Sequence, residues 1–232
     1  MRIFIPSMIE VPYGRYYKTC AELLFKNGFE TFHIDFGDGL FINRKLVPWE
    51  KVEFLKSFGN KLSLTAHIMC KSGSHLDSLE NIIEKCFKYN FKTIYIHPNS
   101  FDDLDSLNNF IVKNFKNFPN IFGMAFEVST EINSELIQFI DQTNINKILQ
   151  MGVPIGKGGQ KFKKESLKII NKIVKESKNV NIVELDGGLD LNIVKQELNP
   201  VIKKLAGWSI ISNENPKLVL KNALSLEKIL KS

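Results

Sequence analysis

Four side chains of two chemical types could together bind a metal ion. His33 and Asp35 lie two positions apart on a predicted strand, so both point to the same face of it. His67 ends a second β-like run, and Asp186 ends a third. Two imidazoles and two carboxylates form a mixed nitrogen and oxygen donor set, which suits Zn²⁺, Fe²⁺, Mn²⁺ or Co²⁺. We therefore predict one divalent metal site, with the identity of the metal left open.

The carboxylates of Asp35 and Asp186 could also do acid–base chemistry. Because they follow distant strands, they could flank a substrate carbon, where one removes a proton and the other returns one. A structural role is the alternative for each residue, since an aspartate can cap a turn and a histidine can be hydrogen-bonded in a core. Asp38-Gly39 is first of all a turn signal. Gly187-Gly188 would leave space for a ligand beside Asp186.

A loop after the sixth β-like run carries three glycines within four positions, Gly156, Gly158 and Gly159. Such a loop before a helix frees backbone N–H groups to approach an anion, although a flexible loop without a ligand is the alternative. Gly207 and Trp208, near the last predicted strand, would provide the second half of a phosphate site in a barrel. These residues predict an anionic substrate.

Eight short β-like runs position these residues, and segments of helical periodicity alternate with them. The runs are Arg2–Pro6, Thr31–Asp35, Leu62–Met69, Thr93–His97, Ile121–Phe126, Lys147–Met151, Asn181–Asp186 and Gly207–Ile211. The apolar faces of predicted helices are Leu76, Leu79, Ile83 and Cys86; Leu167, Ile170 and Val174; and Val219, Ala223, Leu226 and Leu230. Ser134 stands at the start of a further predicted helix, and Pro216 opens the last one.

Eight strand–helix units in 232 residues predict a (β/α)₈ barrel. A doubly wound open sheet is the alternative, but it would usually have a glycine-rich loop where this chain has Pro6-Ser7-Met8. No linker or low-complexity tract divides the chain, so we predict one domain over residues 1–232. Active sites of such barrels lie at the C-terminal ends of the strands. The polar residues at these ends are Ser7, His33, Asp35, His67, His97, Glu127, Gln150 and Asp186.

The composition excludes several classes of protein. A hydrophobic content of 44% excludes a disordered chain, and no apolar run reaches the roughly 18 residues that a membrane span needs. The net charge is +6, but the lysines are spread over helix-like segments, so we expect a small anionic substrate and no nucleic acid. Cys20, Cys70 and Cys86 lack metal-type spacing, and the chain begins without a signal-peptide pattern. We expect a cytoplasmic homo-oligomer.

These motifs resemble those of the ribulose-phosphate 3-epimerase family, and they occur in the same order along nearly the whole chain. Its members are (β/α)₈ barrels of the ribulose-phosphate-binding type that interconvert ribulose 5-phosphate and xylulose 5-phosphate. The motifs that carry the resemblance are Pro6-Ser7, His33-Ile34-Asp35 with Asp38-Gly39, His67 with Met69, Met151, Gly156-Lys157-Gly158-Gly159-Gln160 and Asp186-Gly187-Gly188. A single motif of this kind is weak evidence, but six in the same order are specific.

The resemblance implies a role for each of these residues. His33, Asp35, His67 and Asp186 would hold the metal, while Asp35 and Asp186 would be the catalytic acid/base pair on either side of a metal-stabilised enediolate. It also implies a substrate-binding set that consists of Ser7, Met69, Met151, Gly156, Gly158, Gly159, Gly187, Gly188, Gly207 and Trp208. We therefore expect a metal-dependent ketose-phosphate 3-epimerase that interconverts D-ribulose 5-phosphate and D-xylulose 5-phosphate.

The chain departs from the family pattern at the anion end and at the pocket wall. The positions are Gly37, Leu40, Pro154-Ile155, Lys157 and Trp208, where the family usually has methionine, histidine, Asn-Pro, an aromatic residue and serine. Trp208 keeps a backbone N–H but lacks the hydroxyl, and Lys157 could offset this loss with its charge. Gly37 would enlarge the pocket, so a hexulose phosphate such as allulose 6-phosphate is an alternative substrate. A catalytically silent sugar-phosphate binder is the alternative outside enzymes, although the complete metal set argues against it.

Overall fold

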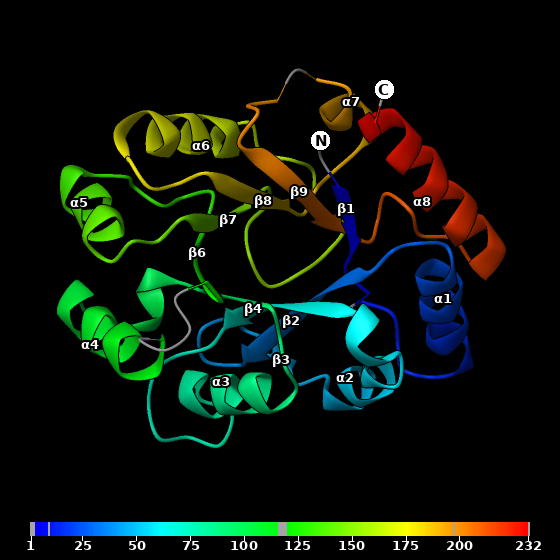
Figure 1. Ribbon diagram of the computed structural model, residues 1–232, viewed down its shortest axis with the longest axis horizontal. Helices are drawn as coiled ribbons and strands as arrows, with labels where there is room; N and C mark the ends of the chain where they lie inside the picture. Colours follow the sequence, from blue (N-terminus) through cyan, green and yellow to red (C-terminus); the bar gives the residue numbers. More distant parts are fainter. Residues whose placement is uncertain (1–2, 9, 116–119, 197, 232) are drawn as a thin grey trace.

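The strands of the protein curl into a barrel (Figure 1). The computed structural model describes residues 3–8, 10–115, 120–196 and 198–231. Over these ranges the sheet has nine strands, in the order β1-β9-β8-β7-β6-β5-β4-β2-β3. The strands are β1 (Ile3–Pro6), β2 (Thr31–Asp38), β3 (Lys45–Leu46), β4 (Ser63–Met69), β5 (Thr93–Ile96), β6 (Phe122–Phe126), β7 (Lys147–Met151), β8 (Ile182–Asp186) and β9 (Ile202–Gly207).

Parallel pairing joins eight of these described strands, while the two-residue β3 runs antiparallel to β2. A parallel bridge between Ser7 and His33 connects the end of β1 to β2, so the ring of eight strands closes. Ring closure removes the free edges that an open sheet would have. The predicted (β/α)₈ barrel is therefore confirmed, and the doubly wound sheet is excluded.

Helices surround the barrel and follow most of its strands (Figure 1). The α-helices are α1 (Arg15–Lys26), α2 (Trp49–Lys56), α3 (Leu79–Lys88), α4 (Leu104–Phe115), α5 (Ser134–Gln142), α6 (Glu165–Glu176), α7 (Leu191–Val194) and α8 (Pro216–Lys231). Two helices begin where the sequence predicts, because the Asn133 side chain caps α5 with a bond of 2.9 Å from Leu136 N–H and Pro216 opens α8. Within the described ranges, every helix is too short or too polar to cross a membrane.

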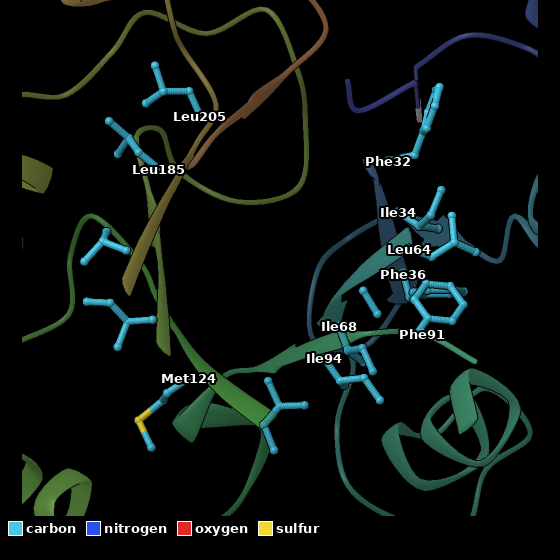
Figure 2. Packing of buried hydrophobic residues seen from close by; sticks show 14 of the residues in the cluster. Phe32, Ile34, Phe36, Leu64, Ile68, Phe91, Ile94, Met124, Leu185 and Leu205 are labelled. Carbon is cyan, nitrogen blue, oxygen red and sulfur yellow. The ribbon is translucent and has the colours of Figure 1, made fainter. Parts of the chain in front are cut away.

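Alternate side chains of β2 enter two different environments. Phe32, Ile34 and Phe36 project into the apolar layer between the barrel and its helices, and Leu185 and Leu205 do the same on the other side of the barrel (Figure 2). Burial of each large apolar side chain contributes about 1.5–3 kcal/mol. A shift of one residue would turn this apolar face toward the interior, so the outer layer fixes which residues of β2 face inward.

The barrel interior contains a second and smaller apolar cluster. Its members are Tyr95, Ala125, Leu149, Met151 and Val153, each at most 5% exposed. They come from β5, β6, β7 and the loop after β7. This apolar half of the interior leaves β2, β4 and β8 to carry the polar side chains.

The prediction for the last strand is wrong. The strand is Ile202–Gly207 and not Gly207–Ile211, because two lysines interrupt its apolar pattern while the apolar residues after it form a turn. Two backbone N–H groups of that turn donate to the Trp208 carbonyl at 3.0 Å. Gly207 and Trp208 consequently lie at the C-terminal end of β9, which is where the barrel architecture places an active site.

Two other expectations also differ from the structure. Leu76 is 80% exposed and precedes α3, because the Ser78 hydroxyl caps a helix that begins at Leu79. Strand β2 continues beyond its predicted end to Asp38, since it pairs with both β4 and β3 there. Arg2, the first residue of the first predicted strand, lies outside the described residues.

Candidate active site

Three strands bring the four predicted metal ligands together at the C-terminal end of the barrel. His33 and Asp35 come from β2, His67 from β4 and Asp186 from β8, and each is at most 7% exposed. One donor atom of each lies within 4.8 Å of the others. Asp35 Oδ1 is 3.2 Å from His33 Nε2 and 3.0 Å from His67 Nδ1. Asp186 Oδ2 is 3.7 Å and 3.9 Å from the same two nitrogens.

A hydrogen-bond partner behind each imidazole orients the ring. The Nδ1–H group of His33 donates a hydrogen bond of 2.7 Å to Glu184 Oε1. The Nε2 atom on the other side of the ring then faces the cluster. His67 Nε2 is 2.8 Å from His97 Nε2, and burial lowers the pKa of both rings. With its proton on Nε2, donated to His97, the His67 ring would offer the Nδ1 lone pair to a metal in place of its contact with Asp35. Histidines that bind metals commonly donate their second N–H in this way.

The buried charges of the cluster shift one another's pKa values. Burial opposes a charge on His33, but Asp35 and Asp186 outweigh it and raise the pKa of this histidine well above its ordinary value. Burial also opposes a charge on Asp35, yet His33 and His67 hold the pKa of Asp35 well below its usual range. Burial, together with the charges of Asp35 and Glu184, raises the pKa of Asp186 to about 7. A bound divalent cation would replace the proton on His33 and favour the ionised form of both carboxylates.

The spacing of the four residues also fits one ion. Atoms bound to the same ion at about 2.0–2.2 Å are at most about 4.4 Å apart. The four nitrogen–oxygen contacts in the cluster, between 3.0 and 3.9 Å, lie within that limit. The donor set, its spacing and its charge therefore allow His33, Asp35, His67 and Asp186 to hold a divalent metal ion.

A cavity of about 290 Å³ extends from the cluster, a volume close to the lower end of small-molecule sites. The residues predicted to bind substrate all line it, namely Ser7, Met69, Met151, Gly156, Gly158, Gly159, Gly187, Gly188, Gly207 and Trp208. Asp35, His67 and Asp186 line it as well, whereas His33 is fully buried behind them. The Ser7 hydroxyl donates to Asp35 Oδ2 at 2.9 Å, so one oxygen of this carboxylate is oriented by the cavity wall.

Three other polar residues at strand ends do not line this cavity. His97 lies behind His67 and contacts the site only through that ring. Gln150 is fully buried, and its side-chain amide donates to the Met151 carbonyl at 3.0 Å. Glu127 lines a separate hollow beside the main cavity. These three strand-end positions therefore support the site or lie next to it.

Gly188 allows the glycine-rich loop to pack against the end of β8. Its φ angle is +68°, and a Cβ atom there would lie 2.6 Å from Val153 Cγ1 and 2.8 Å from the Phe162 backbone nitrogen. No side chain fits in that space, so only glycine permits the close approach of the two segments. Both segments thereby reach the same cavity.

Gly37 does not enlarge the cavity, which corrects the expectation from sequence. A Cβ atom on Gly37 would lie 2.7 Å from Ile42 Cδ1 and 2.9 Å from the Arg44 carbonyl oxygen. The space that a side chain would take is filled by the loop between β2 and β3. The turn at Asp38 is confirmed, because its Oδ1 accepts bonds of 2.8 Å from the N–H groups of Leu40 and Phe41.

Sequence reasoning missed three charged residues at the site. Glu184 is fully buried and lies two positions before Asp186 on β8, so the spacing that linked His33 to Asp35 could have identified it. Glu10 and Arg44 line the cavity and form an ion pair. Both lie in loops, where no periodic pattern indicates which side chains will meet.

The chain is similar to known proteins in both sequence and fold. The model of the "Ribulose-phosphate 3 epimerase family" matches residues 3–205. The protein named ribulose-phosphate 3-epimerase from Mycoplasma genitalium is 31% identical over 193 residues, which cover 79% of this chain and 80% of that protein.

Solved structures with low sequence identity share the fold. KGPDC from Streptococcus mutans has a TM-score of 0.65 at 11% identity, with 100% of both chains covered. The 3-keto-L-gulonate-6-phosphate decarboxylase from Vibrio cholerae has a TM-score of 0.61 at 6% identity and covers 98% of this chain and 97% of its own. The fold likeness, the family match and the more closely related sequence agree, and the chain belongs to the ribulose-phosphate 3-epimerase family.

Proposed function

We propose that the protein is a metal-dependent ketose-phosphate 3-epimerase that interconverts D-ribulose 5-phosphate and D-xylulose 5-phosphate. The observation that carries this proposal is a pair of carboxylates, Asp35 and Asp186, that come from two different strands and line one cavity beside the metal-binding cluster. Epimerisation needs one group to remove a proton from carbon and a second group to return one. Two carboxylates placed in this way are suited to these two roles.

Each carboxylate has a definite task in the proposed reaction. Asp35 is held ionised by His33 and His67, so it accepts a proton from C3 of one epimer. Asp186 reaches the cavity from a different strand, and in its protonated form it delivers a proton to the other face of the same carbon. In the reverse direction Asp186 takes the proton and Asp35 returns it. The bond from Ser7 keeps Asp35 in place during this exchange.

The metal would be held by His33, Asp35, His67 and Asp186. When bound, a divalent ion would act as a Lewis acid toward the negative charge that develops on the substrate oxygens. Glu184 and His97 orient the two imidazoles from behind. The mixed donor set supports Zn²⁺, Fe²⁺, Mn²⁺ or Co²⁺ as the ion.

The remainder of the cavity would bind the substrate. Met69 and Met151 present apolar surface beside the acid/base pair, and Gly187 and Gly188 leave room for the sugar. The phosphate would be bound by backbone N–H groups from two other segments that line the cavity. These segments are the glycine loop, with Gly156, Gly158 and Gly159, and the end of β9, with Gly207 and Trp208. A single-domain chain, a cytoplasmic location and a homo-oligomeric state remain predictions.

Exchange of deuterium from D₂O into C3 tests the proposed function. The wild type should exchange and epimerise ribulose 5-phosphate faster than allulose 6-phosphate, because loop residues fill the space beside Gly37. Asp186→Asn should lose epimerisation, since an amide cannot exchange the proton, and its metal content should be measured alongside. Asp102→Asn, which changes an exposed carboxylate, is the matched control. Turnover in Asp186→Asn at the wild-type rate would refute the two-carboxylate mechanism, and absence of exchange by the wild type would favour a silent binder.

A further inference from the structure

An ion pair stands at the wall of the cavity on the side of the glycine loop. Arg44 Nη1 lies 2.6 Å from Glu10 Oε1, and the two side chains are 36% and 37% exposed. Glu10 belongs to the segment after β1, whereas Arg44 belongs to the loop between β2 and β3. Both residues line the same cavity as the predicted phosphate-binding glycines. The pair therefore places a cation and an anion within reach of a bound substrate.

Packing of the loop between β2 and β3 fixes the backbone of Arg44. Its carbonyl occupies the space beside Gly37, where no side chain is present to exclude it. The neighbouring Ile42 is 5% exposed, and its Cβ atom lies 3.7 Å from the position that a Cβ atom would take on Gly156. The loop is thus held against both β2 and the glycine loop. The guanidinium can then be directed into the cavity with little loss of backbone freedom on binding.

Glu10 lies directly against the glycine loop. A Cβ atom on Gly158 would be 3.1 Å from Glu10 Cγ and 3.3 Å from the same Oε1 atom that Arg44 contacts. A lone carboxylate at this position would repel a phosphate group bound by the loop. Arg44 neutralises this charge, and its hydrogen bond with Glu10 raises the pKa of the guanidinium.

Arginine has the hydrogen-bonding capacity for two anionic partners at once. A guanidinium carries five N–H donors, and one nitrogen of Arg44 is engaged by Glu10. The remaining donors can form paired bonds with phosphate oxygens, a geometry that lysine cannot provide. Arginine is also rare in this chain, with three residues among 31 Lys and Arg, so its position beside the anion site contrasts with the general use of lysine.

We propose that Arg44 binds the terminal phosphate of the substrate and that Glu10 positions its guanidinium against the glycine loop. This assignment rests on the proposed function, since it presumes a phosphorylated ketose in the cavity. It makes Arg44 a residue for affinity and specificity that leaves the proton transfer to the carboxylates. It also accounts for how a phosphate could be bound where Trp208 provides no side-chain hydroxyl.

Three variants separate this role from a purely structural tie between two loops. Arg44→Met removes the cation, and Glu10→Gln keeps a hydrogen-bond acceptor but removes the negative charge. Arg15→Met is the matched control, because Arg15 is exposed on α1 and does not line the cavity. Each variant is measured for KM and kcat with a ketose phosphate, for the same constants with the unphosphorylated ketose, and for the Kd of inorganic phosphate by calorimetry.

Arg44→Met should raise KM for the phosphorylated ketose and the phosphate Kd by about tenfold or more, with kcat nearly unchanged. The unphosphorylated ketose should react as with the wild type, and Glu10→Gln should raise KM for the phosphorylated ketose less than Arg44→Met does, because it keeps the acceptor that positions the guanidinium. The proposal is overturned if Arg44→Met affects phosphorylated and unphosphorylated substrates equally, if it leaves the phosphate Kd unchanged, or if Glu10→Gln raises KM more than Arg44→Met does. If the wild type exchanges no deuterium into C3 of any ketose phosphate, the proposed function fails. The Kd of inorganic phosphate then decides the role of Arg44 by itself.

Discussion

Replacement of Glu184 by glutamine should weaken metal binding without contact between the changed residue and the metal. Glu184 is fully buried and accepts the Nδ1–H of His33 at 2.7 Å, while Lys204 Nζ lies 3.6 Å from its second oxygen. Glutamine has almost the same shape and still offers an acceptor oxygen to His33. The substitution therefore removes the charge of the partner and leaves the packing of the barrel interior nearly unchanged.

The size of the effect follows from the bond that changes. A hydrogen bond to a charged group contributes about 1.5–3 kcal/mol, and a neutral one about 0.5–1.5 kcal/mol. The difference of roughly 1–1.5 kcal/mol corresponds to about tenfold in a binding constant. Loss of a residue behind a metal-bound histidine typically lowers metal affinity by about 10–100-fold, which agrees with this figure. We expect Glu184→Gln to raise the Kd of the metal about tenfold.

Titration of the metal-free protein against a chelating indicator measures this Kd directly. Glu127→Gln is the matched control, because Glu127 follows a strand of the same barrel but lines a different hollow. The control should bind the metal as the wild type does. A wild-type Kd in Glu184→Gln would show that His33 does not depend on this hydrogen bond, and the account of the metal site would then be wrong.

Three further predictions concern pH, the loop after β2 and the phosphate end. In the metal-free protein, burial raises the pKa of Asp186 from 3.8 to about 7. The contribution of this carboxyl to the free energy of unfolding is therefore fully present below about pH 4 and is lost as the pH rises to 7. Asp186→Asn should therefore gain stability over the wild type across this range, on the order of a few kcal/mol in urea unfolding, and parallel pH curves would contradict it. Gly37→Ala should lose about 1–3 kcal/mol in the same assay, because its methyl group meets Ile42 and the Arg44 carbonyl; an unchanged urea midpoint would disprove the contact. Trp208→Ser should lower KM for a pentulose phosphate about tenfold by supplying a hydroxyl donor, and an equal KM would place the phosphate elsewhere.

The strands and their inward-facing residues could be predicted because period-2 alternation is a direct consequence of strand geometry. On β2, the outward Phe32 and Phe36 define the apolar face, so the inward position of His33 and Asp35 follows. The outer positions of β8 are apolar in the same way. Glu184 shares a face with Asp186, so a charged residue at this spacing within an apolar run is the signal that identifies it.

The remaining features could not be predicted because they depend on contacts between distant parts of the chain. Strand β9 contains Lys203 and Lys204, which weaken the apolar signal by which a strand is recognised. Lys204 reaches the buried Glu184 of the neighbouring strand β8, so a partner on another strand explains its place in the barrel. The pairing of Glu10 with Arg44 likewise depends on how two loops fold, and neither loop has a periodic pattern.

Strand register and contacts between loops act on different parts of the proposed reaction. The acid/base pair and the metal ligands are fixed by the hydrogen-bonded register of β2, β4 and β8, and a register change there would also expose apolar side chains to the barrel interior. The anion end is fixed by side-chain contacts among loops, where Gly37, Ile42 and Gly156 set the position of Arg44. Substitutions in those loops can change phosphate affinity without a shift of the strands. The departures from the family pattern at Lys157 and Trp208 lie at this loop-built end, and Gly37 of β2 packs against one of its loops. We therefore expect them to alter KM and specificity while proton transfer at C3 is retained.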